Sequence, residues 1–146
     1  PVAFALLFTM ADLDRLFAGL GDEKLSVNFD PSHLPVINEA PADWVRTLGS
    51  RIVHVHMKDA RVYGPGEEKV SVFGVTLDFE CPPLGQGVVD WPPMVSALRE
   101  IGYEGFLSVE YSAHIFGYNE EPWDRYEVAA QSHRFVDNLL QDTVQT

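Results

Sequence analysis

Three short strings of the sequence place metal-binding residue types at the ends of apolar runs. They are Asn28 to His33, His54 to Asp59 and Ser108 to Tyr111. Each lies where a short run rich in β-branched residues stops and a loop or helix is expected to begin. Parallel strands end at the same edge of a sheet, so polar side chains at successive strand ends come together. The pattern therefore indicates a metal-dependent enzyme.

The first string has two interpretations. Asp30 and His33 stand three residues apart, and a turn after a strand could direct both into one pocket. The same residues also fit an Asp-Pro-Ser turn in which Asp30 accepts backbone N–H bonds. Taken alone, the string favours the turn.

The second string carries two histidines on one strand. His54 and His56 are two residues apart, so both side chains project from the same face. Buried imidazoles need hydrogen-bond partners, so this pair is unusual as plain core. His56, nearer the carboxyl end, is the better candidate ligand. His54 would be a satisfied core residue or a support for its neighbour.

The third string ends an apolar run with Glu110. Glutamate is rarely buried unless it is paired or binds a metal, so its position calls for a partner. An ion pair with Lys58 or Arg61 is the simpler alternative to a metal.

Together, Asp30, His56 and Glu110 form an oxygen and nitrogen donor set. Divalent Mn, Mg, Co or Zn accepts such ligands. Cys81 is the one cysteine of the chain and lies outside this set, so a structural zinc site is not expected. We expect the three residues to hold one divalent ion.

Hydrophobic periodicity predicts an alternation of helices and strands. Strands are expected near 25–30, 52–58 and 105–110, and helices near 13–20, 41–48, 91–101 and 123–141. Such alternation predicts a parallel sheet with right-handed crossovers. Asp90 is expected to cap the third helix. The Gly- and Pro-rich segment 59–88 reads as a functional loop or lid, with a small hairpin within 70–79.

The composition and net charge of the chain indicate which kinds of molecule it could bind. The 146 residues suit one domain, and 46% are hydrophobic, so a packed core is expected. The formal net charge of −12 disfavours nucleic acid and anionic membrane surfaces. A sugar or another small polar molecule fits better. A single cysteine is compatible with the cytoplasm, and the apolar start, Pro1 to Phe8, is too short to span a membrane.

Several ordered blocks resemble one known family. They are VNFDPSHL at 27–34, RIVHVHMKD at 51–59, LGQGVVDW at 84–91, and the stretch from Ile101 to Glu110. The chain resembles the C-terminal half of the sugar phosphate isomerase/epimerase superfamily of xylose isomerase-like TIM barrels.

This resemblance implies a site. In such enzymes one divalent metal is held by a Glu, an Asp, a His and a second Glu from successive strands. The last three match Asp30, His56 and Glu110, and Glu110 would also be catalytic. The first Glu would lie upstream of this chain's start. The resemblance further implies substrate-binding roles for three residues, namely His33, Lys58 and Arg61.

The implied fold is a (β/α)8 TIM barrel, which takes about 250 residues. Residues 1–146 would form only its C-terminal part, with three to four βα units. Because an open half-barrel exposes strand edges, we expect this chain to belong to a longer chain or to form a homo-oligomer.

The implied function is a divalent-metal isomerase or epimerase of a keto-sugar or sugar phosphate that transfers protons through an enediolate. A keto-polyol (inosose-type) dehydratase of the same superfamily is an alternative. A metal-dependent nuclease is a weaker one, because the chain is acidic. A truncated barrel acting as a non-catalytic assembly module also remains open.

Overall fold

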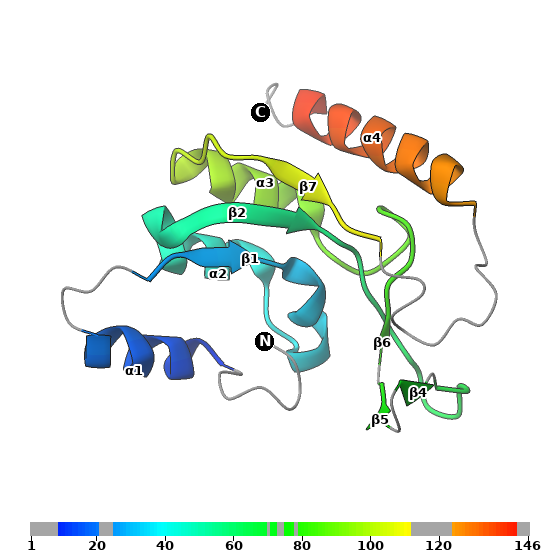
Figure 1. Ribbon diagram of the computed structural model, residues 1–146, viewed down its shortest axis with the longest axis horizontal. Helices are drawn as coiled ribbons and strands as arrows, with labels where there is room; N and C mark the ends of the chain where they lie inside the picture. The colour runs from blue at the N-terminus through cyan, green and yellow to red at the C-terminus, as the bar shows by residue number, and fades with distance from the viewer. Residues whose placement is uncertain are drawn as a thin grey trace.

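The described chain alternates helices with strands (Figure 1). The computed structural model describes residues 9–20, 25–69, 71–72, 75–77, 79–111 and 124–142. Its α-helices are α1 (Met10–Leu20), α2 (Pro41–Leu48), α3 (Trp91–Glu100) and α4 (Arg125–Asp142). Its strands are β1 (Val27–Phe29), β2 (Ile52–Met57), β3 (Arg61–Val62), β4 (Ser71–Val72), β5 (Val75–Thr76), β6 (Phe79–Glu80) and β7 (Leu107–Val109). Three 3-10 turns are η1 (Pro31–His33), η2 (Pro35–Ile37) and η3 (Gly49–Arg51).

A parallel sheet of three strands, in the order β1-β2-β7, organises the molecule. In the register, Val55 of β2 pairs with Phe29 on one side and Leu107 on the other. All three strands therefore end at the same edge. The prediction of an α/β fold with a parallel sheet is confirmed.

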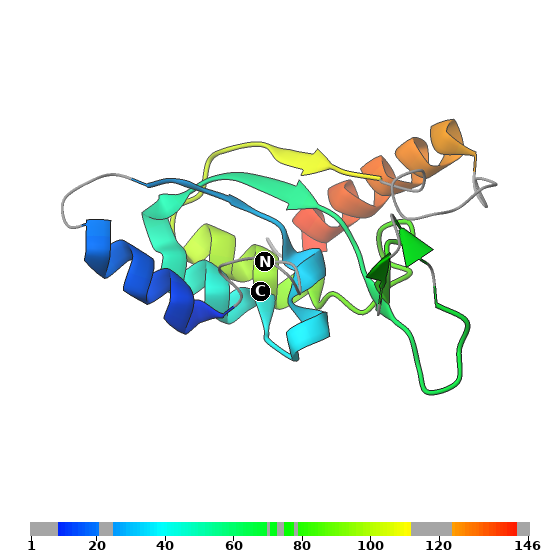
Figure 2. The same cartoon turned by 60° about the horizontal axis from the view of Figure 1, so that its bottom comes forward.

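Helices cover one face of this sheet (Figure 2). The core between them contains Val55 and Met57 of β2, which are buried against Val45 of α2 and Met94 of α3. Within the described residues no helix covers the opposite face of the sheet. Along each strand, alternate residues therefore face the helices, and the residues between them face the uncovered side of the sheet.

The boundaries of α2 and α3 coincide with prolines and glycines in the sequence. Prolines occupy the first turns of α2 and α3, and Gly49 and Gly102, both at positive φ, follow the last turns. Asp90 stands at the N-cap of α3 but makes no side-chain cap hydrogen bond, so its predicted capping role is wrong. Another carboxylate holds this helix start instead.

That carboxylate belongs to Asp59, which follows β2 and is 1% exposed. Its oxygens accept hydrogen bonds from the backbone N–H groups of Gly85, Gly87 and Val89, at 2.9, 3.1 and 3.2 Å. They also accept one from the indole N–H of Trp91 at 3.2 Å and one from the next backbone amide at 2.9 Å. One buried side chain thus fastens the loop before α3 to the end of β2.

Two glycines make this packing possible. A Cβ at Gly87 would overlap the Asp59 carboxylate and the Ala60 carbonyl oxygen. Gly85 has a φ of +81°, a left-handed conformation that other residues adopt at a cost, and a Cβ there would meet the Phe135 ring. The Leu-Gly-Gln-Gly string is therefore explained by close approach and backbone geometry.

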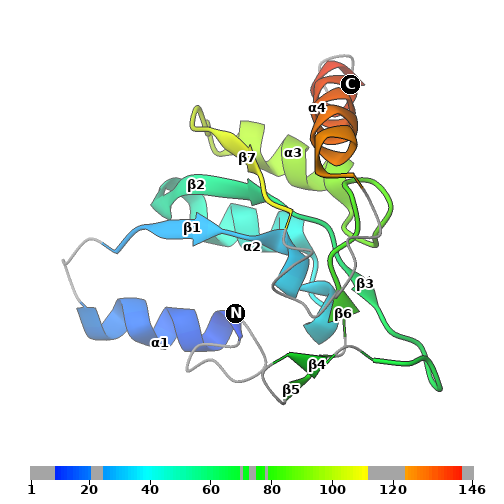
Figure 3. The ribbon, with the colours of Figure 1, turned by 45° about the vertical axis from the view of Figure 1, so that its right-hand side comes forward.

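Within the described residues of segment 59–88, two antiparallel strand pairs, β3 with β6 and β4 with β5, form an extension of the molecule. Figure 3 shows β3 and β6 beyond the carboxyl end of β2. The hairpin predicted within 70–79 is confirmed by the pairing of β4 with β5. Ala60, Phe79 and Cys81 form a small buried cluster at the base of the extension.

The Asp59 network predicts a large loss of stability in Asp59→Asn. An amide turns N–H groups toward donors that need an acceptor, and buried unsatisfied donors cost about 1–3 kcal/mol each. We expect the free energy of unfolding to fall by about 2–4 kcal/mol in urea titrations. Asp90→Asn, an exposed change in the same loop, is the matched control and should lie within about 0.5 kcal/mol of wild type. Equal losses in both variants would contradict the account.

Cys81 gives a second prediction. Burial raises the pKa of its thiol from 9.0 to about 12. Thiolate is the reactive form, so alkylation of the folded protein at pH 8 should be at least about a thousand-fold slower than that of the urea-unfolded chain. Mass spectrometry of iodoacetamide-treated samples measures the rates. Comparable rates in both states would show that the cluster at the base of the extension is open.

Candidate metal centre

The carboxyl edge of the sheet gathers the predicted polar residues. His54, His56 and Lys58 alternate along β2 and its continuation, so they share the face opposite the helices. Asp30 follows β1 and Glu110 follows β7, the two neighbours of β2. Parallel pairing therefore brings together side chains that are far apart in the sequence.

Asp30, His56 and Glu110 offer one ligand atom each, and these atoms lie within 4.8 Å of one another. His56 Nδ1 is 2.6 Å from Glu110 Oε2. The three side chains are half-buried, so a solute can reach them. The structure brings together the three residues predicted as metal ligands.

Asp30 serves the turn and the cluster at once. Its Oδ1 accepts hydrogen bonds from the Ser32 backbone N–H at 2.9 Å and from the Ser32 hydroxyl at 2.7 Å. Its Oδ2 lies 3.5 Å from His33 Nε2 and 3.8 Å from Lys58 Nζ. The turn proposed as the simpler interpretation is therefore present, and it leaves the second oxygen directed at the site.

Lys58 supplies the cluster's positive charge. Its side chain is almost fully buried, and its Nζ lies 2.7 Å from Glu110 Oε1. Burial lowers the pKa of Lys58, but the hydrogen bond to Glu110 and the charge of Asp30 raise it, and the net pKa lies above its ordinary value. The ion pair considered as the alternative partner for Glu110 therefore exists. One ammonium between two carboxylates leaves a net negative charge that favours a further cation.

His33 lies on η1 beside Asp30. Burial lowers the pKa of its imidazole below the ordinary value, although the neighbouring Asp30 carboxylate opposes this. Its ring packs edge-on against Phe79 of β6, with ring centroids 5.8 Å apart. The extension thus reaches the cluster, and burial favours the neutral form of the His33 imidazole.

Arg61 lies away from this cluster. It is paired with Glu80, its Nη1 lies 3.0 Å from Glu67 Oε1, and its guanidinium stacks over the Tyr63 ring at 5.1 Å. It does not line the cavity around the cluster. Its substrate-binding role stays a prediction.

Asn28 was missed in the sequence although it contacts a candidate ligand. Its amide Nδ2 lies 3.1 Å from His56 Nε2. The available signal was its position: it precedes Asp30 by two residues and so shares that residue's face of an otherwise apolar strand. His54 also supports His56, by an edge-on ring contact at 5.4 Å.

A cavity of about 510 Å³ opens at this cluster. Two carboxylates and an imidazole, with no thiolate, form a donor set that suits a hard or borderline divalent cation. Three protein ligands leave coordination positions for substrate or for a further donor. The residues present therefore fit a divalent ion. The lining residues are Leu13, Val27, Asn28, Phe29, Asp30, His33, Leu34, Trp44, Leu48, His56, Lys58 and Glu110.

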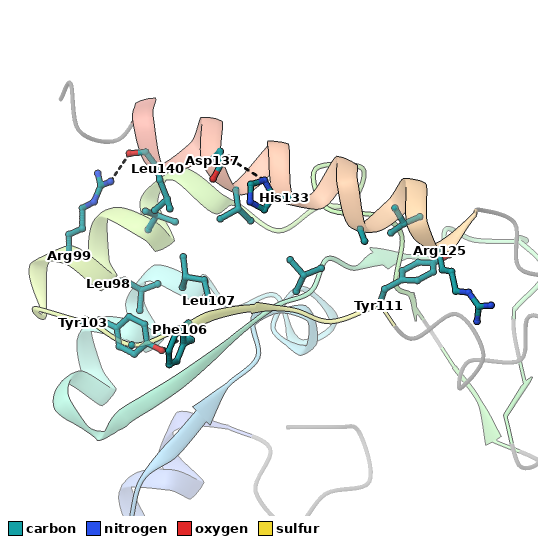
Figure 4. Close-up of a pocket in the computed structure, with 16 residues that line it drawn as sticks. Leu98, Arg99, Tyr103, Phe106, Leu107, Tyr111, Arg125, His133, Asp137 and Leu140 are labelled. Atoms are coloured by element: carbon teal, nitrogen blue, oxygen red, sulfur yellow. Dashed lines mark hydrogen bonds and ion pairs between the residues drawn. The ribbon is translucent and has the colours of Figure 1, made fainter.

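A larger groove of about 790 Å³ lies between α4 and β7 (Figure 4). Its lining is mostly aliphatic and aromatic. Arg99 donates to the Leu140 carbonyl at 2.7 Å, and His133 pairs with Asp137 at 3.2 Å. These two interactions join polar groups of the helices to one another, and the candidate metal ligands among the described residues line the smaller cavity instead.

The described helices include none with both the length and the apolar character required to cross a membrane.

Comparisons with known proteins agree with this architecture. Inosose dehydratase of Lacticaseibacillus casei is 34% identical over 106 residues, which cover 70% of this chain and 35% of that enzyme. A xylose isomerase domain protein from Planctomyces limnophilus superposes with a TM-score of 0.69 at 21% identity, covering 93% of this chain and 45% of that one. The structure of an L-ribulose 3-epimerase gives a TM-score of 0.68 at 21% identity, covering 96% and 44%.

The chain spans about a third of the length of the curated relatives it matches. Its three parallel strands and covering helices are correspondingly part of a barrel. The match to the family described as xylose isomerase-like TIM barrel extends over residues 2–139, so the chain belongs to that family.

Proposed function

We propose that this chain supplies Asp30, His56 and Glu110 to a divalent-metal site in an enzyme that acts on a keto-sugar or keto-polyol. The supporting observation is the convergence of three ligand atoms within 4.8 Å at the carboxyl edge of the sheet. That edge is where barrels of this type place their active sites. The acidic chain and the sugar-modifying relatives support a small, polar, uncharged substrate.

A bound divalent ion would polarise the substrate carbonyl and acidify the neighbouring C–H bond. We assign the removal of that proton to Glu110, because it directly follows β7 and lines the cavity. Lys58 holds the Glu110 carboxylate at 2.7 Å and fixes its direction. His33 lines the cavity, and its imidazole can form a hydrogen bond with a substrate hydroxyl.

The leading candidate reaction is isomerisation or epimerisation. After the proton is removed, it returns either to the neighbouring carbon or to the opposite face of the same carbon. Glu110 serves one face of the substrate, so an epimerase needs a second acid or base on the other. We propose that this group, and with it a further metal ligand, comes from outside the described residues, either from a longer polypeptide or from a second copy.

Dehydration of a keto-polyol is the second candidate. It is favoured by the 34% identity to inosose dehydratase. In that reaction the C–H bond next to the carbonyl and the C–O bond of the following carbon break, a C=C bond forms, and water leaves. Lys58 lies beside Glu110 and is a suitable proton donor to the departing hydroxide. The two candidates share the first proton transfer and differ in whether oxygen is lost.

Metal binding tests the site. We expect the purified chain to bind Mn²⁺ in calorimetric titrations, and Asp30→Asn, His56→Ala and Glu110→Gln each to weaken binding at least about ten-fold, since each removes one of three ligands. Asp43→Asn, an exposed carboxylate on α2, is the control and should bind as wild type does. Wild-type affinity in all three ligand variants would overturn the site.

Product analysis in D2O tests the reaction. We expect turnover of a ketohexose or a cyclic keto-polyol to place deuterium on the carbon next to the carbonyl. An epimerase or isomerase product keeps every oxygen, whereas a dehydratase product is lighter by one water in mass spectra. Glu110→Gln should lower either turnover by about a hundred-fold or more. Undiminished turnover in that variant would remove Glu110 from the chemistry.

A further inference from the structure

His56 is engaged at both ring nitrogens. Nδ1 lies 2.6 Å from Glu110 Oε2, and Nε2 lies 3.1 Å from Asn28 Nδ2. A neutral imidazole carries one proton, so one nitrogen donates while the other accepts. The group that faces Nε2 therefore decides whether Nδ1 is a donor or a lone pair.

Nδ1 is the nitrogen that faces the Glu110 carboxylate. If an Asn28 N–H group donates to Nε2 of a neutral ring, the ring proton must lie on Nδ1, where it faces Glu110. A cation held by Nδ1 requires the reverse, with the proton on Nε2 and an acceptor opposite it. The Asn28 amide contains that acceptor, because a half turn of its end group exchanges N–H for the carbonyl oxygen.

We propose that Asn28 is a positioning residue that selects the metal-binding tautomer of His56. Its carbonyl oxygen accepts the Nε2–H proton when a divalent ion binds at Nδ1, and its N–H group returns to Nε2 when the ion leaves. The inference rests on the proposed metal site. Ligand histidines generally donate their second ring N–H to a carboxylate or carbonyl, which fixes the ring and strengthens the ligand.

The place of Asn28 in the sheet supports this role. Asn28 pairs in register with His54 across the contact of β1 with β2, and it lies two residues before Asp30. β1 therefore leads to one candidate ligand, Asp30, and through Asn28 also orients another, His56. The edge-on contact of His54 with His56 is between the two rings, and it restrains the His56 ring from a second side.

Zinc titration distinguishes a hydrogen-bonding role of the Asn28 amide from a role that depends only on its volume. We expect Asn28→Leu, which keeps the volume but removes the acceptor, to weaken Zn²⁺ binding about 10–100-fold. Asn28→Asp, which can only accept, should bind at least as tightly as wild type. Asn138→Leu on α4 repeats the chemical change at an exposed site and should have no effect. Circular dichroism of each variant checks folding.

The tautomer provides a readout that a structural role would not change. In ¹⁵N spectra of the zinc-loaded wild type, we expect the His56 proton on Nε2 and the metal on Nδ1. Zinc on Nε2 would overturn the inference, even if Asn28→Leu failed to fold. Wild-type affinity in Asn28→Leu would also overturn it while leaving the metal site standing. If wild-type protein bound no zinc, the metal site and the role of Asn28 would fall together.

Discussion

Parallel pairing of β2 between β1 and β7 is the constraint on which the rest of the structure depends. Alternation along one strand sends Val55 and Met57 to the helices and His56 and Lys58 to the open face. A slip of one residue would exchange these sets, turning two polar side chains toward the helices and the apolar core residues away from them. The apolar contacts that stabilise the sheet therefore also aim the polar residues.

Asp59 extends this constraint to the next part of the chain. It directly follows Lys58, so the end of β2 orients a charge toward the site and a carboxylate toward the loop before α3. The site and the loop thus share one anchor. The extension formed by β3 to β6 departs from the same point and returns Phe79 to His33.

Much of this arrangement could be predicted from sequence. Hydrophobic periodicity located the strands and helices. The residue types at the strand ends then identified Asp30, His56 and Glu110 as neighbours, because parallel strands end at the same edge of a sheet. The distant partners of Asp59 could not be predicted, since they lie 26 to 32 residues away and depend on how a loop folds back. Arg61 illustrates the same limit: its pairing with Glu80 follows from the register of β3 with β6.

The exposed surface of this sheet is consistent with part of a barrel. Among the described strands, β1 and β7 pair on one side only, and Phe106 beside β7 is 82% exposed. In a closed barrel the open face of the sheet, with its histidines and lysine, lines the interior. The polar residues on this face therefore lie where the barrel fold of the family would bring side chains from several strands into one site.

The most direct test of the metal centre is an anomalous difference map from crystals soaked in Mn²⁺. The account predicts a single strong peak in contact with the carboxylates of Asp30 and Glu110 and with Nδ1 of His56. A cluster without a peak, with Lys58 still bridging the two carboxylates, would contradict it. The three residues would then form an ion-pair network that holds the strand ends together, and the chemistry would have to lie elsewhere.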